Sequence, residues 1–133
     1  EITIVPIKGK LDNFTVDHEE KVITLNDLKT TGKPVSFFMG GNVTNDGETV
    51  WYDGSFQKFH YYRQFGLYFW MLVSALKAVK GLEGYSTKAN ILVVETIPEF
   101  NNKVYKVTDS HIKAGLNEFK QLLIGYVKWK NKN

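Results

Sequence analysis

The sequence predicts a mixed α/β (α+β) fold, with a central sheet of mixed strand direction flanked by helices. The order of patterns along the chain is strand, strand, strand, helix, strand, strand, helix, which favours a sheet with helices packed on it. The run Asn90 to Ile97 is the most apolar strand pattern, as found in the middle of a sheet. The chain has 133 residues, of which 43% are hydrophobic, so one domain, residues 1–133, is expected.

The first half of the chain contains the predicted strands and the first helix. Two strands, Ile2 to Val16 and Lys21 to Lys29, are joined by a short polar loop and predict a hairpin. A third short strand is expected over Pro34 to Met39. The following segment, Gly40 to Gly54, contains glycines and Asn45-Asp46-Gly47, which indicate a mobile loop or a tight hairpin. Such a loop is a candidate to close over a ligand.

Two helices account for most of the rest. The first is expected from about Phe56 to Val79, with Ser55 as its N-cap. After Asn90 to Ile97, the alternating run Lys103 to Val107 predicts a hairpin partner. The last helix is capped by Thr108 or Asp109 and is expected to run to about Lys130.

Composition excludes several classes of protein. There are no cysteines, which excludes disulfides, thiolate zinc sites and cysteine nucleophiles and fits a cytoplasmic setting. The net charge of +3 permits binding to a polyanion without demanding it. The most apolar run, Phe65 to Leu76, is too short to span a bilayer, so no membrane partner is expected. The chain begins at Glu1, directly on a predicted strand, which indicates a fragment of a longer chain.

Three charged residues lie at the ends of the first two predicted strands. Asp27 and Lys29 are two positions apart, so their side chains lie on one face of a strand. An even number of loop residues would place Asp12 on the same face, close to Asp27. Gathering these charges costs stability unless a hard cation lies between the carboxylates and the lysine faces a reacting group.

Gln64 and Tyr68 are four residues apart on the long apolar helix, and therefore lie on one face, one turn apart. A glutamine on a mostly buried helix needs hydrogen-bond partners. Taken alone, the pair is compatible with a backbone contact for Gln64 and a core position for Tyr68.

Taken together, these motifs resemble the PD-(D/E)xK nuclease superfamily. The matching segments are Gly9-Lys10-Leu11-Asp12, Asp27-Leu28-Lys29-Thr30-Thr31 and Gln64-x-x-x-Tyr68, in the order and on the elements seen in the RecB-like and phage-exonuclease branch. The likeness covers about Lys8 to Ala75 and implies a restriction-endonuclease-like core. That branch has a helix before the first core strand, with a His or Glu that completes the site, and no residue before Glu1 is present to match it.

The resemblance implies specific roles. Asp12 and Asp27 would ligate Mg²⁺ or Mn²⁺, with the carbonyl of Leu28 completing the site, and Lys29 would position the attacking water or stabilise charge on the phosphate. Gln64 and Tyr68 would shape the site near the scissile phosphate. Two carboxylates suffice for Mg²⁺ because this ion usually keeps several waters.

Basic and aromatic residues at the start of the long helix are candidate contacts to DNA. Lys58 and Arg63 would pair with phosphates, and Tyr61 and Tyr62 would stack on an unpaired end. The alternative is that the tyrosines pack on the sheet and the charges are merely exposed. His60 is expected to be a DNA contact or a plain surface residue.

Other polar side chains are expected to be structural or solvated. His111 is expected to be structural and His18 to be solvated, while Glu95 is expected to face solvent. Lys8, Lys10 and Lys33 are further candidate contacts with DNA.

The resemblance implies a metal-dependent DNA nuclease core, an exonuclease of phage or mobile-element type. One alternative is a non-catalytic DNA-binding or assembly domain that keeps the fold. Another is an unrelated α+β domain in which the motifs are coincidence. DNA is the expected partner, and the alternatives for a protein partner are a second copy of the chain or a recombination partner such as a strand-annealing protein.

Overall fold

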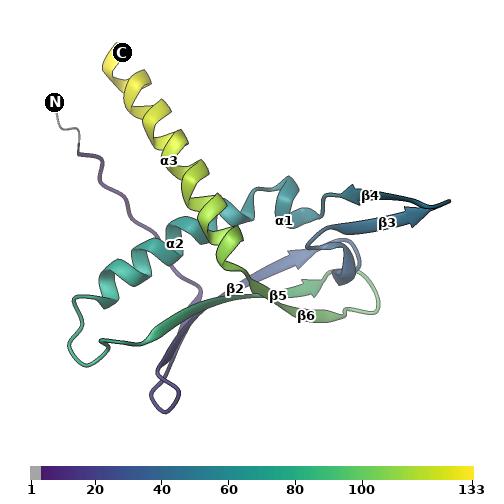
Figure 1. Ribbon diagram of the computed structural model, residues 1–133, viewed down its shortest axis with the longest axis horizontal. Helices are drawn as coiled ribbons and strands as arrows, with labels where there is room; N and C mark the ends of the chain where they lie inside the picture. Colours follow the sequence, from purple (N-terminus) through teal and green to yellow (C-terminus); the bar gives the residue numbers. More distant parts are fainter. Residues whose placement is uncertain (1–3) are drawn as a thin grey trace.

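The computed structural model describes residues 4–133, which form a four-stranded sheet, a separate two-stranded hairpin and helices (Figure 1). The elements, in chain order, are β1 (Asn13–Asp17), β2 (Val22–Thr31), the 3-10 helix η1 (Val35–Phe37), β3 (Gly41–Asn45), β4 (Glu48–Tyr52), α1 (Ser55–Lys58), α2 (Tyr61–Leu76), β5 (Ser86–Glu95), β6 (Asn102–Val107) and α3 (Asp109–Lys132).

The sheet has the order β1-β2-β5-β6. β1 pairs antiparallel with β2, β2 pairs parallel with β5, and β5 pairs antiparallel with β6. Parallel neighbours need a crossover connection, which α2 supplies here. The prediction of a mixed sheet with helices is therefore confirmed, as is the central position of the apolar strand.

The helices cover one face of this sheet. Alternate residues of the two central strands point to that face and are fully buried, including Ile23, Leu25 and Ile91. On the opposite face Leu28 is 53% exposed and Val104 is 61% exposed. Within residues 4–133, no helix covers this second face of the sheet, which is open to solvent.

Two glycines set how closely α2 and α3 cross. A Cβ added to Gly115 would lie 1.8 Å from the carbonyl oxygen of Tyr62, and one added to Gly66 would lie 2.3 Å from the backbone nitrogen of Leu116. The helices thus meet backbone to backbone, which only glycine permits. Beyond this crossing α3 continues away from the sheet (Figure 1).

The N-terminal strand is shorter than predicted. The predicted strand began at Ile2, whose position lies outside the described residues, and residues 4–12 contain no strand. Pairing with β2 begins only at Asn13, opposite Asn26. Before that point the chain packs against α2, where a Cβ on Gly9 would lie 2.9 Å from the ring of Tyr68.

The segment Pro34 to Met39 is not a strand, so this prediction was wrong. Pro34, with φ −54°, precedes η1, and Phe38 is buried in the core. One turn of 3-10 helix directs that ring inward. The segment after it forms the β3–β4 hairpin, one of the two predicted alternatives for this loop.

The long helix predicted from Phe56 to Val79 is divided into α1 and α2. His60 lies between them in the left-handed region, with φ +53°, which interrupts the helical hydrogen bonds. Gly54, rather than Ser55, is the N-cap of α1, and its N–H donates to Gln57 Oε1 at 3.0 Å.

In the C-terminal half, β5 begins at Ser86, earlier than predicted, because it continues the parallel ladder with β2. The predicted β5–β6 hairpin is confirmed. Thr108 caps α3, and its hydroxyl accepts from the His111 N–H at 3.2 Å. The His111 ring lies 5.0 Å from that of Phe56, so its predicted structural role is supported.

Glu95 does not face solvent, in contrast to the prediction. It is only 4% exposed, and its carboxylate accepts from the backbone N–H groups of Val35 at 2.9 Å and Asn101 at 3.0 Å. These donors satisfy a charge that would otherwise be costly to bury. No helix among residues 4–133 is long and apolar enough to cross a membrane.

Candidate functional site

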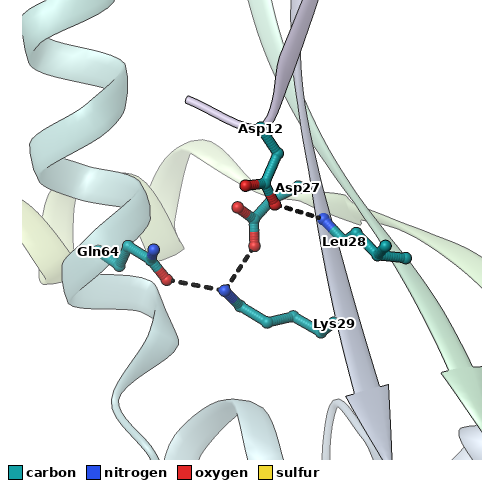
Figure 2. A network of polar contacts seen from close by, with 5 residues as sticks. All are labelled: Asp12, Asp27, Leu28, Lys29 and Gln64. Atoms are coloured by element: carbon teal, nitrogen blue, oxygen red, sulfur yellow. Dashed lines mark hydrogen bonds and ion pairs between the residues drawn. The ribbon is translucent and has the colours of Figure 1, made fainter. Parts of the chain in front are cut away.

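The two predicted carboxylates lie side by side. Asn13 pairs with Asn26, so Asp12, immediately before β1, is brought opposite Asp27. The Leu28 N–H donates to Asp12 Oδ2 at 3.1 Å, as Figure 2 shows. In a strand the N–H and C=O of one residue point toward the same neighbour, so the Leu28 carbonyl points to the same edge as Asp12.

This edge is open beside the carboxylates. β1 pairs with β2 only from Val22 to Asn26, although β2 continues to Thr31. Among the described residues, no strand pairs with the outer edge of β2 beyond Asn26. A cavity of about 360 Å³ adjoins this point on the open face of the sheet, lined in part by Asp12, Asp27 and Leu28. A ligand can therefore approach the carboxylates from the sheet edge.

Lys29 joins the pair from the same face of β2. Its Nζ lies 2.7 Å from Asp27 Oδ2 and donates to Gln64 Oε1 on α2 at 3.0 Å (Figure 2). The structure thus brings together residues from the segment before β1, from β2 and from α2, namely Asp12, Asp27, Leu28, Lys29 and Gln64. Gln64, a polar residue on an apolar helix, has the partner that its position requires.

The two carboxyl groups have opposite pKa shifts. Burial raises the pKa of Asp27, which is 5% exposed, and the neighbouring Asp12 adds to this rise while Lys29 opposes it. The hydrogen bond from the Leu28 N–H lowers the pKa of the exposed Asp12. Asp27 Oδ2 is buried and has only the ion pair with Lys29, without a hydrogen bond of good geometry. It therefore retains capacity to coordinate a cation.

The donor set fits a hard divalent ion. Two carboxylates and one backbone carbonyl are oxygen ligands of the type that Mg²⁺ and Mn²⁺ accept, with water filling the other positions. Among residues 4–133, no three His, Cys, Asp or Glu side chains gather as a metal-binding group. Within the described part of the chain, the site therefore offers two acidic candidate ligands, Asp12 and Asp27.

Tyr68 lies apart from this cluster. It is half-buried, packs against the hydrophobic core and contacts the chain at Gly9. Its hydroxyl makes no hydrogen bond within residues 4–133. The structure therefore gives Tyr68 a packing contact and does not join it to the carboxylates.

The predicted DNA contacts divide into separate groups. Lys58 is exposed at the end of α1, whereas Arg63 Nη1 lies 3.4 Å from Glu118 Oε1 on α3. Tyr62 also turns toward α3, where the Glu118 carboxylate raises the pKa of its hydroxyl, and that hydroxyl lies 2.7 Å from His60 Nδ1. His60 Nδ1 lies 3.0 Å from the same carboxylate. Lys58 is exposed, and its side chain makes no ion pair or hydrogen bond within residues 4–133.

Other candidates from the sequence lie on the surface. Lys8, Lys10 and Lys33 are exposed. His18 is exposed, and its Nδ1 lies 2.8 Å from the hydroxyl of Tyr85. None of these four side chains contacts the carboxylate pair among the hydrogen bonds and ion pairs of residues 4–133.

The sequence reasoning missed the surroundings of Lys29. Tyr61 was expected either to stack on DNA or to pack on the sheet, and the structure places its ring beneath the Lys29 ammonium, 4.7 Å from Nζ. The high aromatic content of this region was a signal, but it did not identify this partner. Comparisons with family models, with curated proteins and with solved structures found no match for this chain.

Proposed function

We propose that the chain is the core of a metal-dependent nuclease that hydrolyses phosphodiester bonds in DNA. The observation that supports this most is the juxtaposition of Asp12, Asp27 and the Leu28 carbonyl at an open sheet edge, with Lys29 beside them. It is the arrangement expected from the resemblance to the PD-(D/E)xK superfamily. The antiparallel β1–β2 pair and the parallel β2–α2–β5 crossover fit a restriction-endonuclease-like core.

Mg²⁺ or Mn²⁺ is the proposed cofactor, held by Asp12, Asp27 and the Leu28 carbonyl. When bound, such an ion lowers the pKa of a water molecule and neutralises charge on the phosphate. The ion would bind the Asp27 oxygen that faces Asp12 and would weaken the contact of Oδ2 with Lys29 (Figure 2). Hydrolysis breaks one P–O bond and adds the elements of water, leaving a phosphate monoester and a hydroxyl group.

Lys29 would supply a fixed positive charge and a donor to the phosphate. Gln64, which accepts from Lys29 at 3.0 Å, would hold that ammonium toward the sheet edge. Lys58, exposed at the end of α1, would contact the phosphate backbone of DNA and contribute a salt-dependent part of the affinity. An exonuclease of phage or mobile-element type is the finer form of this proposal.

A non-catalytic DNA-binding or assembly domain is the second candidate. It is favoured by the presence of only two acidic ligands among the described residues. Such a domain would bind DNA without a divalent ion, whereas the nuclease requires one for cleavage.

Calorimetry with Mn²⁺ on the parent chain, Asp27→Asn and Glu48→Ala tests the metal site. The nuclease proposal expects binding by the parent and by Glu48→Ala, an exposed acid on the β3–β4 hairpin, and no binding by Asp27→Asn. Linear and plasmid duplexes with Mg²⁺ then test cleavage, together with Lys29→Met. That variant should bind Mn²⁺ and cleave at least about 100-fold more slowly, because it lacks the charge beside the phosphate. Metal-independent DNA binding without cleavage would favour the second candidate.

A further inference from the structure

The ammonium of Lys29 has a third neighbour besides Asp27 and Gln64. Its Nζ lies 4.7 Å from the centroid of the Tyr61 ring, the first residue of α2. The face of an aromatic ring attracts a cation electrostatically at this distance. The Tyr61 hydroxyl makes no hydrogen bond to any of residues 4–133, so the ring itself provides the contact.

Tyr61 is held in place by two further rings. Its ring stacks on Phe38, with centroids 5.9 Å apart and planes inclined by 13°. Phe38 is 1% exposed and stacks in turn on Tyr105, with centroids 6.4 Å apart. The Tyr105 hydroxyl donates to the carbonyl of Val35 at 2.7 Å. Tyr61 therefore cannot turn outward to stack on a nucleobase without leaving this column of rings.

The two oxygens of Asp27 face different neighbours, because Oδ2 faces Lys29 and the other oxygen faces Asp12 (Figure 2). A cation between Asp12 and Asp27 would draw negative charge from the Asp27 carboxylate and weaken its ion pair with Lys29, whose Nζ lies 2.7 Å from Oδ2. Lys29 would then retain two contacts, the amide oxygen of Gln64 and the face of Tyr61. Neither group is charged, so neither competes for the metal.

We propose that Tyr61 is a positioning residue, whose ring face holds the Lys29 ammonium toward the phosphate once a metal has engaged Asp27. This inference rests on the proposed nuclease function and assigns Tyr61 a role other than contact with DNA. The hydroxyl of Tyr61 has no part in it. Phenylalanine should therefore replace tyrosine, and an aliphatic side chain should not.

Steady-state cleavage of a linear duplex with Mg²⁺ tests this role through Tyr61→Leu, Tyr61→Phe and the control Trp70→Leu, which removes a half-exposed ring from the same helix. Tyr61→Leu should lower kcat at least about tenfold and change KM less than about twofold, because a misplaced ammonium affects the chemical step. Tyr61→Phe should keep kcat within about threefold of the parent value, and Trp70→Leu should change neither constant. A rise in KM at constant kcat, or equal losses with Leu and Phe, would overturn the proposal.

Side-chain NMR of Lys29 separates this proposal from the nuclease proposal and does not require activity. In the parent chain and in Tyr61→Phe, the Lys29 Hε resonances should remain shifted upfield by the ring when Mg²⁺ is added. In Tyr61→Leu they should lie at positions typical of an exposed lysine, while thermal melting and the Phe variant show whether the fold is kept. If Mg²⁺ releases Lys29 from the ring in a parent chain that cleaves DNA, positioning by Tyr61 is refuted and the nuclease stands. If the parent keeps the shifted signals and cleaves no DNA, the nuclease proposal fails instead.

Discussion

Replacing Glu95 by alanine is expected to destabilise the chain by about 3 to 5 kcal/mol. The carboxylate is 4% exposed and accepts two backbone N–H groups, from Val35 at 2.9 Å and from Asn101 at 3.0 Å. A hydrogen bond to a charged group contributes about 1.5 to 3 kcal/mol, so two contribute about 3 to 6 before the desolvation of the carboxylate is subtracted. Alanine would leave both donors without this acceptor in a buried place.

Urea denaturation followed by circular dichroism measures this loss. Glu95→Gln keeps one acceptor oxygen and should lose about half as much free energy, near 2 kcal/mol. Glu20→Ala, at an exposed turn position, is the control and should lie within about 0.5 kcal/mol of the parent. A loss below about 1 kcal/mol for Glu95→Ala, with unchanged m-value, would refute the reasoning that Glu95 holds η1 and the β5–β6 turn together.

Three further predictions follow from contacts described above. Gly115→Ala should lower the free energy of unfolding by at least about 2 kcal/mol in the same urea assay, because its Cβ would lie 1.8 Å from the Tyr62 carbonyl oxygen. Gly125→Ala, with open space around the added Cβ, is the control and should raise the free energy of unfolding by up to about 1 kcal/mol. Asp12→Asn should lower the pKa of Asp27 in a carboxyl-carbon NMR titration, since the neighbouring Asp12 contributes to raising it, and an unchanged pKa would contradict that contact. Folding raises the pKa of Asp27 above its ordinary value of 3.8. The stability that this group contributes is therefore fully present below pH 3.8 and declines as pH rises through the raised pKa. In a series of urea midpoints measured against pH, Asp27→Asn should lack this decline.

Much of the sheet could be predicted because its strands have local signatures. The polar loop between β1 and β2 predicted the hairpin, and the two-residue spacing of Asp27 and Lys29 predicted that both side chains lie on one face of β2. The apolar run of β5 indicated a central strand, although its start at Ser86 depended on pairing with β2. The approach of Gln64 to Lys29 required the crossover, which the sequence pattern implied only through the order of its elements.

Other features depended on contacts between distant segments. The helix breaks at His60, where no proline or glycine in the sequence indicates a break. The His60 imidazole lies 3.0 Å from the Glu118 carboxylate on α3, a contact between distant segments. The two partners of Glu95 are Val35 in η1 and Asn101 in the β5–β6 connection. Because both are distant contacts, an acid beside Val94 was interpreted as a surface residue. For Pro34 to Met39, burial of Phe38 decided the local structure more than strand propensity did.

The parallel pairing of β2 with β5 also bears on the order of events in folding. Ile23 pairs with Thr87, and the whole of α1 and α2 lies between these residues in the chain. The β1–β2 hairpin closes over a short loop, but the central pair must wait for a long loop closure, which makes such topologies slow to fold. On a ribosome, β2 would emerge well before its central neighbour exists. The hairpin alone brings Asp12 opposite Asp27. The burial of Asp27 is therefore expected to be a later event in the maturation of each molecule.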